Sequence, residues 1–320
     1  MHVPVMLEEV INILDPKPGD IYIDATVGLG GHAKAIAEKI FPDGLLIGID
    51  RDNKALEIAA TLLSGYNVKL IQANFRDIDV VLESQGIKKV RGVLFDLGVS
   101  SLQIDDETRG FSFIKNGPLD MRMGPDASLK AIDIINNSSL EQLVKLFKDY
   151  GEERNAYIIA KAIVERREKE KIETTLDLVE VIRKALPKPL QRKMGKHPAR
   201  RVFQALRIAV NDELNSLEEG LRKSFDFLEV GGVICVISYH SLEDRIVKLL
   251  FKALCEGKVA EFVVKGTLFP SKKEVLSNPR SRSARLRAIR RVKEGEVFKS
   301  FNNSLDILRH SYCSTSNCKP

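Results

Sequence analysis

The sequence predicts an α/β protein in which a doubly wound, Rossmann-like sheet of parallel strands is interrupted by an inserted helical domain. Short β-branched runs alternate with helical patterns through the first hundred residues. This alternation then stops and resumes only at a buried strand pattern at residues 230–237. A chain of 320 residues, 44% hydrophobic and 29% charged, has a globular composition and can form a core with a large insertion.

The first hundred residues predict the order βαβαβαβ. Crossovers of this kind are right-handed, and sheets built from them bind ligands outside the carboxyl ends of their strands. The expected strands are residues 21–24, 45–50, 68–73 and 90–97, and the expected helices are residues 32–40, 53–63 and 78–84.

The interruption is expected to be mainly helical. A helix from about residue 198 to residue 228 carries one apolar stripe throughout and is expected to bridge the insertion and the core. We therefore expect a core of residues 1–105 and 206–320 around an inserted helical domain of residues 106–205. The other expected elements are helices at residues 139–147, 154–170, 176–186 and 242–254 and strands at residues 260–264 and 286–292.

The net charge of +6 is unevenly distributed along the chain. Residues 1–106 carry 10 basic and 16 acidic side chains, whereas residues 107–212 carry 21 and 15 and residues 213–320 carry 19 and 13. Residues 183–207 contain nine Lys or Arg and no acidic side chain, and residues 280–293 contain seven and none. Each run is a candidate surface for a polyanion, with an ordinary solvated face as the alternative, and two such runs favour nucleic acid as the partner.

The sequence gives no indication of a membrane segment, a secretory signal or a metal site. The longest apolar stretch, residues 230–237, falls far short of the ~18–20 residues that span a bilayer. Residues 1–5 contain no basic region before an apolar segment, so we expect a cytoplasmic protein that does not contact membranes. Neither zinc nor structural disulfides are expected, because no C-x-x-C pair occurs. The cysteines are Cys235, Cys255, Cys313 and Cys318.

A glycine-rich turn between the first expected strand and the helix after it indicates a nucleotide-type site. Gly28, Gly30 and Gly31 let the backbone turn tightly and approach a ligand, whose anionic end can meet the free N–H groups that open the helix. Asp50 ends the second strand, where a carboxylate can accept both hydroxyls of a ribose. An ordinary glycine turn with a surface acid is the alternative, but strand, turn, helix and acid all fall in register.

Asp24 determines which nucleotide we expect. The spacing Gly28-x-Gly30-x-x-Ala33 also fits the dinucleotide fingerprint. A carboxylate directly before the turn would repel a pyrophosphate, however, whereas it would attract the ammonium and sulfonium groups of S-adenosylmethionine. We therefore expect S-adenosylmethionine as the cofactor, and a capping or turn role for Asp24 near Thr26 is the alternative.

Asp96 ends the fourth expected strand, beside the cleft where a second substrate would meet the cofactor. An exocyclic base amine is a poor nucleophile because its lone pair is delocalised into the ring. A carboxylate that accepts hydrogen bonds from the amine favours a pyramidal nitrogen and takes up developing positive charge. We predict that Asp96 is the catalytic residue, with a loop-capping role as the alternative.

Several longer motifs accompany these residues and span almost the whole chain. They are residues 2–7 (HVPVML), 30–32 (GGH), 96–101 (DLGVSS), 109–113 (RGFSF), 118–123 (PLDMRM), 197–207 (HPARRVFQALR), 239–245 (YHSLEDR) and 282–287 (RSARLR). Together they are far more specific than a glycine turn. In these motifs the chain resembles the bacterial small-subunit (16S) ribosomal RNA cytosine-N4 methyltransferase family.

The resemblance implies a class I S-adenosylmethionine-dependent methyltransferase whose helical substrate-recognition domain is inserted after the fourth strand. It implies direct in-line methyl transfer to N4 of a cytidine in the decoding centre of 16S ribosomal RNA, within the small ribosomal subunit. The implied cofactor contacts are Gly30, Gly31, His32, Asp50, Phe75, Asp96 and Gln103, to which the arguments above add Asp24 and Gly28. The sequence departs from the family pattern at Ala33, where serine is frequent, and at Tyr239, where phenylalanine is usual.

Four of the matched aromatic and polar residues have a physical role available. Phe75 can cover the face of the adenine, and Gln103 can hydrogen-bond the methionine end of the cofactor or the incoming base. Phe111 or Phe113 can stack on a base flipped out of the RNA, with a purely structural pair as the alternative.

Two polar motifs are expected to be structural. Asp120 and Arg122 are predicted to form an ion pair within their loop. The sequence His240-Ser241 suggests a hydrolase at first sight, but we expect a helix start with Ser241 as the N-cap, because adjacent residues rarely align as nucleophile and base.

Two other classes of protein remain possible from the sequence. A nicotinamide-dependent oxidoreductase would use the same glycine turn, and a non-catalytic RNA-binding factor could share the same scaffold. A homodimer is also possible, and the sequence does not decide the oligomeric state.

Overall fold

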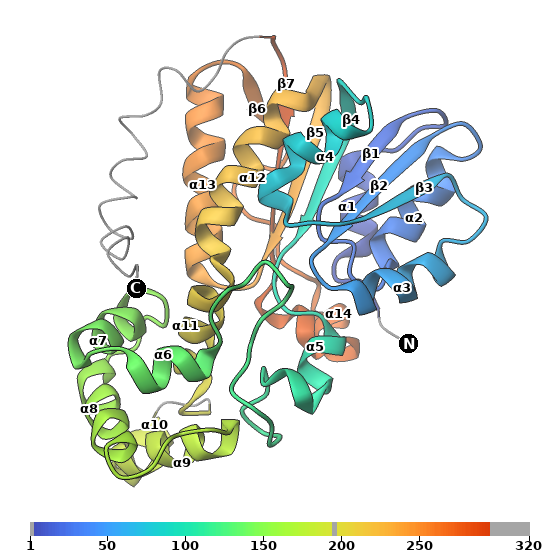
Figure 1. Ribbon diagram of the computed structural model, residues 1–320. Coiled ribbons are helices and arrows are strands. Elements are labelled where there is room, and N and C mark those ends of the chain that lie inside the picture. The colour runs from blue at the N-terminus through green and yellow to red at the C-terminus, as the bar shows by residue number, and fades with distance from the viewer. Residues whose placement is uncertain (1–2, 194–196, 295–320) are drawn as a thin grey trace. The chain divides into compact units, whose positions relative to one another are not determined.

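The computed structural model describes residues 3–193 and 197–294 (Figure 1). The chain forms two compact units. Of the described residues, the core unit comprises 3–98 and 214–294, and the helical unit comprises 99–193 and 197–213. The predicted domain boundaries, after residues 105 and 205, both fall inside the helical unit.

The core unit contains a seven-stranded sheet in the order β3-β2-β1-β4-β5-β7-β6. Its strands are β1 (Ile21–Asp24), β2 (Leu45–Asp50), β3 (Val68–Gln72), β4 (Val90–Asp96), β5 (Leu228–Ser238), β6 (Ala260–Phe262) and β7 (Arg285–Arg291). The first five in this order are parallel, whereas β7 is antiparallel to both β5 and β6. Every predicted strand is confirmed to within a few residues at its ends.

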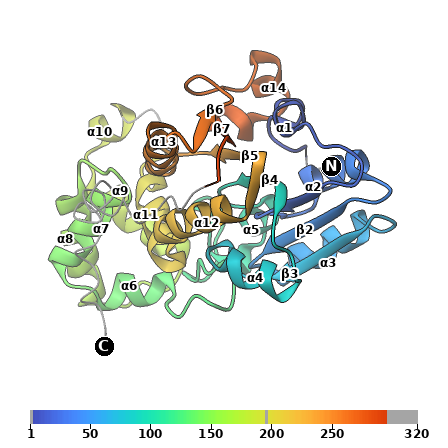
Figure 2. The same ribbon diagram turned by 90° about the horizontal axis from the view of Figure 1, so that it is seen from above.

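Helices cover both faces of this sheet, as Figure 2 shows. They are α1 (Leu7–Leu14), α2 (Gly31–Ile40), α3 (Asn53–Leu62), α4 (Ile78–Ser84), α12 (Glu213–Phe227), α13 (Ser241–Glu256) and α14 (Lys272–Ser277). Helices α1, α2 and α3 share one apolar core with the sheet, in which Val10, Ile36 and Ala59 pack with Tyr22 and Leu94. Helices α4, α12 and α13 lie on the opposite face (Figure 2). This is the predicted doubly wound arrangement.

The helical unit contains α5 (Ser101–Asp105), α6 (Ala131–Asn137), α7 (Leu140–Asp149), α8 (Ala156–Arg167), α9 (Thr175–Ala185), α10 (Lys188–Lys193) and α11 (Arg200–Asn211). Its own apolar core includes Phe147, Ile159, Ile182 and Leu206, all fully buried. Helices α7, α8 and α9 confirm the predicted helical insertion. No helix within residues 3–193 and 197–294 is long and apolar enough to cross a membrane.

The predicted single helix from about residue 198 to residue 228 is wrong, because two helices occupy this stretch. Asp212 between α11 and α12 has a left-handed backbone, with φ of 49°, which interrupts the helical hydrogen bonds. The buried side chain of Asn211 accepts from the Met123 N–H and donates to the Met121 carbonyl, which fixes the end of α11. The apolar residues of α11 therefore pack in the core of the helical unit, whereas those of α12 belong to the core unit. The helical unit ends at Glu213 and not at the predicted residue 205.

Candidate active site

The predicted glycine turn lies between β1 and α2 in the core unit. Gly28 and Gly30 have φ of 51° and 86°, a backbone region that glycine enters without a steric cost. The Gly28 N–H donates to Oδ2 of Asp50 over 2.9 Å, so the turn is tied to the carboxyl end of β2. A Cβ atom at Gly31 would lie 2.5 Å from Cγ of Pro4, so Gly31 is needed for packing against the N-terminal segment.

The segment before α1 lies against the start of α2. The backbone carbonyl of Val5 is 2.9 Å from Nε2 of His32, and because a carbonyl only accepts, Nε2 carries the proton. The Met6 N–H donates to Oε1 of Glu274 in α14 over 2.8 Å. His32, predicted as a cofactor contact, is therefore buried and held in one orientation by the N-terminal segment.

Asp24 ends β1 and is only 1% exposed. One of its carboxylate oxygens accepts the Thr26 N–H over 3.2 Å, so the predicted alternative, a local turn role, is also present. Burial raises the pKa of Asp24 to about 7, and the charges of Asp96 and Asp50 act in the same direction. A cation that binds beside this buried carboxyl group would stabilise its ionised form, and the ionised carboxylate would in turn attract the cation.

Asp50 at the end of β2 is held by backbone donors. Its Oδ2 accepts the Gly28 N–H and its Oδ1 accepts the Asp52 N–H, each over 2.9 Å. Burial raises the pKa of Asp50 to about 6, although both hydrogen bonds act to lower it. Each carboxylate oxygen has a second lone pair, so the side chain can still accept the hydroxyls of a ribose.

Asp96 ends β4, and its carboxylate contacts side chains from two other elements. Its own N–H donates to Oγ1 of Thr26 over 2.7 Å, which ties the ends of β4 and β1 together. Tyr239, directly after β5, donates its hydroxyl to Oδ1 of Asp96 over 2.7 Å. Nδ1 of His32 lies 3.5 Å from Oδ2. The structure thus brings Asp24, Asp96 and His32 to one edge of the sheet, as predicted.

The sequence did not reveal Tyr239 as a partner of Asp96. A signal was available, because Tyr239 follows the strand at residues 230–237 and so lies at the same edge of a parallel sheet as Asp96. Which of the residues at such an edge touch each other depends on side-chain directions, which sequence spacing does not give.

Phe75 follows β3 and opens a short 3₁₀ helix, Phe75–Asp77. Its ring packs edge-on against Phe95 with centroids 5.5 Å apart. A Cβ at Gly220 would lie 2.9 Å from Cδ2 of Phe75, so α12 can approach this ring only with glycine at that position. The ring remains partly exposed, and contact with an adenine stays a prediction.

Gln103 belongs to the helical unit, where it forms a capping box at the start of α5. Its Oε1 accepts the Ser100 N–H over 3.1 Å, and its own N–H donates to the Ser100 hydroxyl over 3.2 Å. The side chain is buried and fixed in this cap. The predicted contact of Gln103 with cofactor or base therefore stays a prediction.

The aromatic pair Phe111 and Phe113 divides into two roles within the helical unit. Phe111 is buried in the apolar core. Phe113 stacks on the imidazole of His197 with centroids 4.7 Å apart and meets Phe203 edge-on. Burial and the charge of Arg183 both lower the pKa of His197, so this stack has a neutral imidazole at pH 7. The structural alternative therefore accounts for Phe111.

The predicted ion pair between Asp120 and Arg122 is confirmed. Nε and Nη2 of Arg122 donate to the two carboxylate oxygens over 2.8 and 2.9 Å. Burial alone would raise the pKa of Asp120, but the hydrogen bonds and charge of Arg122 outweigh it and hold the pKa below its ordinary value. This bidentate pair stabilises the loop before α6.

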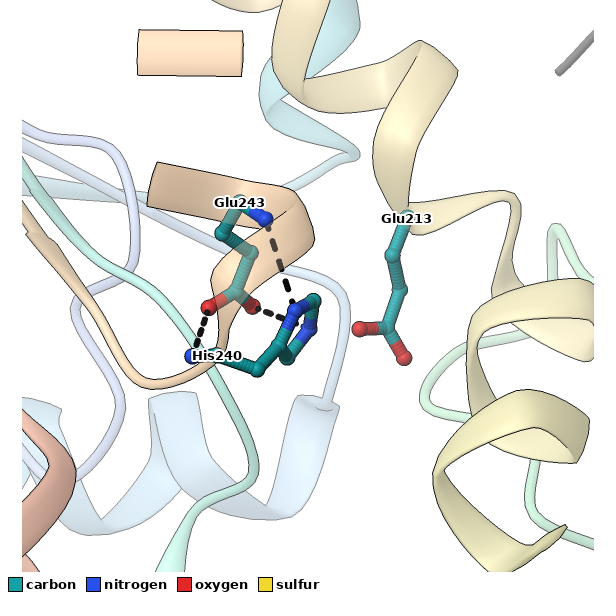
Figure 3. A group of neighbouring side chains, drawn as sticks. All are labelled: Glu213, His240 and Glu243. Carbon is teal, nitrogen blue, oxygen red and sulfur yellow. Dashed lines mark hydrogen bonds and ion pairs between the residues drawn. The ribbon is translucent and has the colours of Figure 1, made fainter. Parts of the chain in front are cut away.

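The predicted N-cap of α13 is wrong by one residue, because His240 and not Ser241 caps the helix. Nδ1 of His240 accepts the Glu243 N–H, and the Glu243 carboxylate accepts the His240 N–H (Figure 3). Oε1 of Glu243 also lies 3.0 Å from Nε2 of His240. The imidazole thus acts as the cap acceptor, a role that sequence rules assign to Ser or Asp.

The basic run at residues 280–293 is largely occupied in internal contacts. Arg285 and Arg287 both bind the carboxylate of Asp244, with the closest distance 2.7 Å from Arg287. Arg291 is 2% exposed and donates to backbone carbonyls at the end of α12. Arg287 and Arg291 therefore stabilise the fold, and contact of the rest of this run with RNA stays a prediction.

The basic run at residues 183–207 contains both paired and exposed side chains. Arg207 forms a bidentate ion pair with Glu213, with both distances 2.8 Å. Lys188 and Arg192 on α10 are exposed. The helical unit therefore retains cations on its surface that can contact phosphates.

The strand order, the antiparallel β7 and the acids at the ends of β1, β2 and β4 define a class I S-adenosylmethionine-dependent methyltransferase. A family model described as the MraW methylase family matches residues 1–292. The chain belongs to that family. The predicted family and enzyme class are therefore confirmed.

Relatives named Ribosomal RNA small subunit methyltransferase H are similar over almost their whole length. The protein of Caldicellulosiruptor bescii is 50% identical over 307 residues, covering 91% of this chain and 99% of its own. That of Halothermothrix orenii is 48% identical, covering 91% and 98%. The structure of an rRNA methylase from Streptococcus thermophilus aligns at 12% identity with a TM-score of 0.44, so the family assignment rests on the sequence matches.

Proposed function

We propose that this protein transfers a methyl group from S-adenosylmethionine to N4 of a cytidine in the decoding centre of 16S ribosomal RNA. Membership of the methylase family and relatives named for methylation of small-subunit ribosomal RNA support this substrate class. The observation that carries the chemistry is the Asp96 carboxylate, held by Tyr239 at the carboxyl end of β4, next to Asp24 and the glycine turn. The nicotinamide alternative is disfavoured by the same family membership.

The residues at this edge fit S-adenosylmethionine. When bound, the cofactor supplies an electrophilic methyl group on a cationic sulfur. Asp24 would face its positive charges, Asp50 would accept the ribose hydroxyls, and Phe75 would cover the adenine. Gly28, Gly30 and His32 shape the turn beside it, and their roles as cofactor contacts belong to this proposal.

Asp96 would act by binding and orienting the amine of the cytosine. Its carboxylate accepts a hydrogen bond from the exocyclic N–H, which localises the lone pair on nitrogen and stabilises the positive charge that develops there. No covalent enzyme intermediate is needed. Holding amine and methyl group in line can supply about 7–11 kcal/mol in favourable systems, while withdrawing the base from its stack costs a few kcal/mol.

The helical unit would bind the RNA of the small ribosomal subunit, and such an enzyme would work in the cytoplasm. Support comes from the exposed cations of α10 and from the aromatic stack at Phe113. The substrate-recognition role of this unit, the preference for a ribosomal particle and a homodimer are parts of the proposal that its experiments must decide.

The proposal is tested by incubating the protein with labelled S-adenosylmethionine and small subunits that lack the modification. Nucleosides from the RNA are then mapped by mass spectrometry, and N4-methylcytidine at a single decoding-centre position is the expected product. Label at another atom, or transfer to no RNA at all, would overturn the proposal. Titration with a dinucleotide and with S-adenosylmethionine distinguishes the oxidoreductase alternative, because only the latter should bind.

RNA binding is expected to depend strongly on salt. The affinity of the protein for RNA should fall at least ~tenfold between ~50 and ~200 mM salt. Contacts between Lys or Arg and phosphates release counterions from the RNA, and this release is less favourable at higher salt concentration. Lys188→Ala should weaken binding and reduce the salt slope, since Lys188 is exposed on α10. The matched control is Lys252→Ala, a lysine of α13 that pairs with Glu256 and should leave the slope unchanged. An affinity that is constant over this range would contradict the assignment.

A further inference from the structure

Tyr239 is fixed on three sides at the end of β5. Its N–H donates to Oε2 of Glu243 in α13 over 2.8 Å. Its ring lies against Gly98, where a Cβ would be 3.1 Å from Cδ2 of the tyrosine and where φ is 110°. Its hydroxyl donates to Oδ1 of Asp96 over 2.7 Å. Backbone, ring and hydroxyl therefore have one position relative to the carboxylate.

The direction of this hydrogen bond follows from the surroundings of the phenol. Burial raises the pKa of Tyr239 well above its ordinary value, and the charge of Asp96 raises it further. The hydroxyl therefore keeps its proton at any working pH and acts as the donor. Phenol donors to a carboxylate are charge-assisted and stronger than bonds between neutral groups.

His32 faces the other oxygen of the same carboxylate. Its Nδ1 lies 3.5 Å from Oδ2 of Asp96, while its Nε2 is held by the Val5 carbonyl. The two oxygens of Asp96 thus meet groups from different elements, Tyr239 after β5 and His32 on α2. The hydrogen bond from Tyr239 orients the carboxylate, which decides where a substrate amine can donate.

We propose that Tyr239 is a positioning residue that holds Asp96 ionised and oriented for the amine of the RNA base. The inference rests on the proposed role of Asp96. A hydrogen bond to the ionised carboxylate favours that form over the protonated one, and only the ionised form accepts from the amine at both oxygens. Loss of the hydroxyl should therefore slow methyl transfer and move the acid limb of the pH profile of kcat to higher pH.

Other titratable groups surround this pair. Those that face Asp96 or Tyr239 are Asp24, His32, Cys235, Glu243 and Glu274. Because a Tyr239→Phe substitution leaves all of them in place, a difference between the wild-type and variant profiles reports the lost hydroxyl.

The test compares the wild-type protein with Tyr239→Phe and Tyr22→Phe in methyl transfer to undermethylated small subunits. Tyr239→Phe should lower kcat roughly three- to tenfold and shift the acid limb upward by roughly half to one pH unit, with KM for S-adenosylmethionine little changed. Tyr22→Phe is the matched control, because it removes another buried hydroxyl bond of the core unit, to the Leu14 carbonyl over 2.8 Å. It should leave kcat and its pH profile unchanged.

A double-substitution cycle separates positioning through Asp96 from general packing. In an Asp96→Asn background, adding Tyr239→Phe should have little further effect on the residual rate. An unchanged kcat and pH profile in Tyr239→Phe, or an equal loss in both backgrounds, would overturn the inference. Full activity of Asp96→Asn would instead refute the proposed role of Asp96 itself, so the two failures are distinguishable.

Discussion

Asp96→Asn should lower kcat for RNA methylation by about 10²–10³-fold while the protein remains folded. Asparagine has the shape of aspartate, but it lacks the negative charge and offers only one acceptor atom. The amine of the base would then lose the group that takes up its developing charge. Rapid-quench measurement of a single turnover with labelled cofactor would isolate this step, and KM for S-adenosylmethionine should change much less than kcat.

Asp79→Asn is a suitable control for this substitution. Asp79 is an acid of α4 in the same unit and forms an ion pair of 2.9 Å with Lys223. Its replacement should cost at most about 1 kcal/mol of stability, because the pair is partly exposed, and should leave kcat unchanged. Equal activity of the Asp96 and Asp79 variants would remove Asp96 from the mechanism.

Asp24→Asn should stabilise the cofactor-free protein and at the same time abolish tight binding of S-adenosylmethionine. Burial raises the pKa of Asp24 from 3.8 to about 7. Between pH 3.8 and about 7, Asp24 is therefore protonated in the folded protein but ionised in the unfolded chain. Stability therefore falls as the pH rises from about 4 to about 7, and the full penalty is present above pH 7. At pH 8 the neutral asparagine should raise the free energy of unfolding by about 2–4 kcal/mol.

The cofactor is expected to bind more tightly to the wild-type protein as the pH rises from about 6 to about 8. A cation beside Asp24 favours its ionised form, so binding at the lower pH must release a proton. Calorimetry in two buffers of different ionisation enthalpy would measure this release, which Asp24→Asn should reduce. Asp50, whose pKa is raised to about 6, would account for the remainder at the lower end of this range.

Asp20→Asn provides the control, because Asp20 precedes β1 at the opposite end of the strand from Asp24, and its side chain accepts the nearby Lys17 N–H. This variant should bind S-adenosylmethionine as the wild type does. If Asp24→Asn also retained wild-type affinity, the cationic cofactor would not depend on Asp24, and the predicted role of this residue would be wrong.

Local sequence patterns predicted the helices and strands correctly where each element packs within a single hydrophobic core. Each strand of the sheet was recognisable, because β-branched runs of four to eight residues are typical of buried strands. The helix predicted from about residue 198 to residue 228 was wrong for a physical reason. The spacing of its apolar residues continues without a break through Asp212. The left-handed backbone of Asp212 nevertheless ends one helix there, so the apolar residues before and after it pack in different units. Regular spacing alone does not predict such a break.

The site could be predicted in part. Asp24, Asp50 and Asp96 were recognisable because each ends a parallel strand, and strand ends meet at one edge. The role of the basic run at residues 280–293 could not be predicted from the sequence. Arg285 and Arg287 bind the carboxylate of Asp244, which lies about 40 residues before them in the chain. A count of charges does not show which of them are paired.

By itself the sequence determined the alternation of strands and helices, the acids at the strand ends and the family to which the chain belongs, since these depend on spacing along the chain. Only the tertiary structure decided which side chains meet. Tyr239 is 143 residues away from Asp96 in the sequence but donates a hydrogen bond to it, and His32 lies beside Asp96 at the start of α2. These residues meet because β4 pairs in parallel with β5 and β1, which brings the ends of the three strands together. Hydrogen bonds act over about 3 Å in space, and no local pattern encodes such a distance.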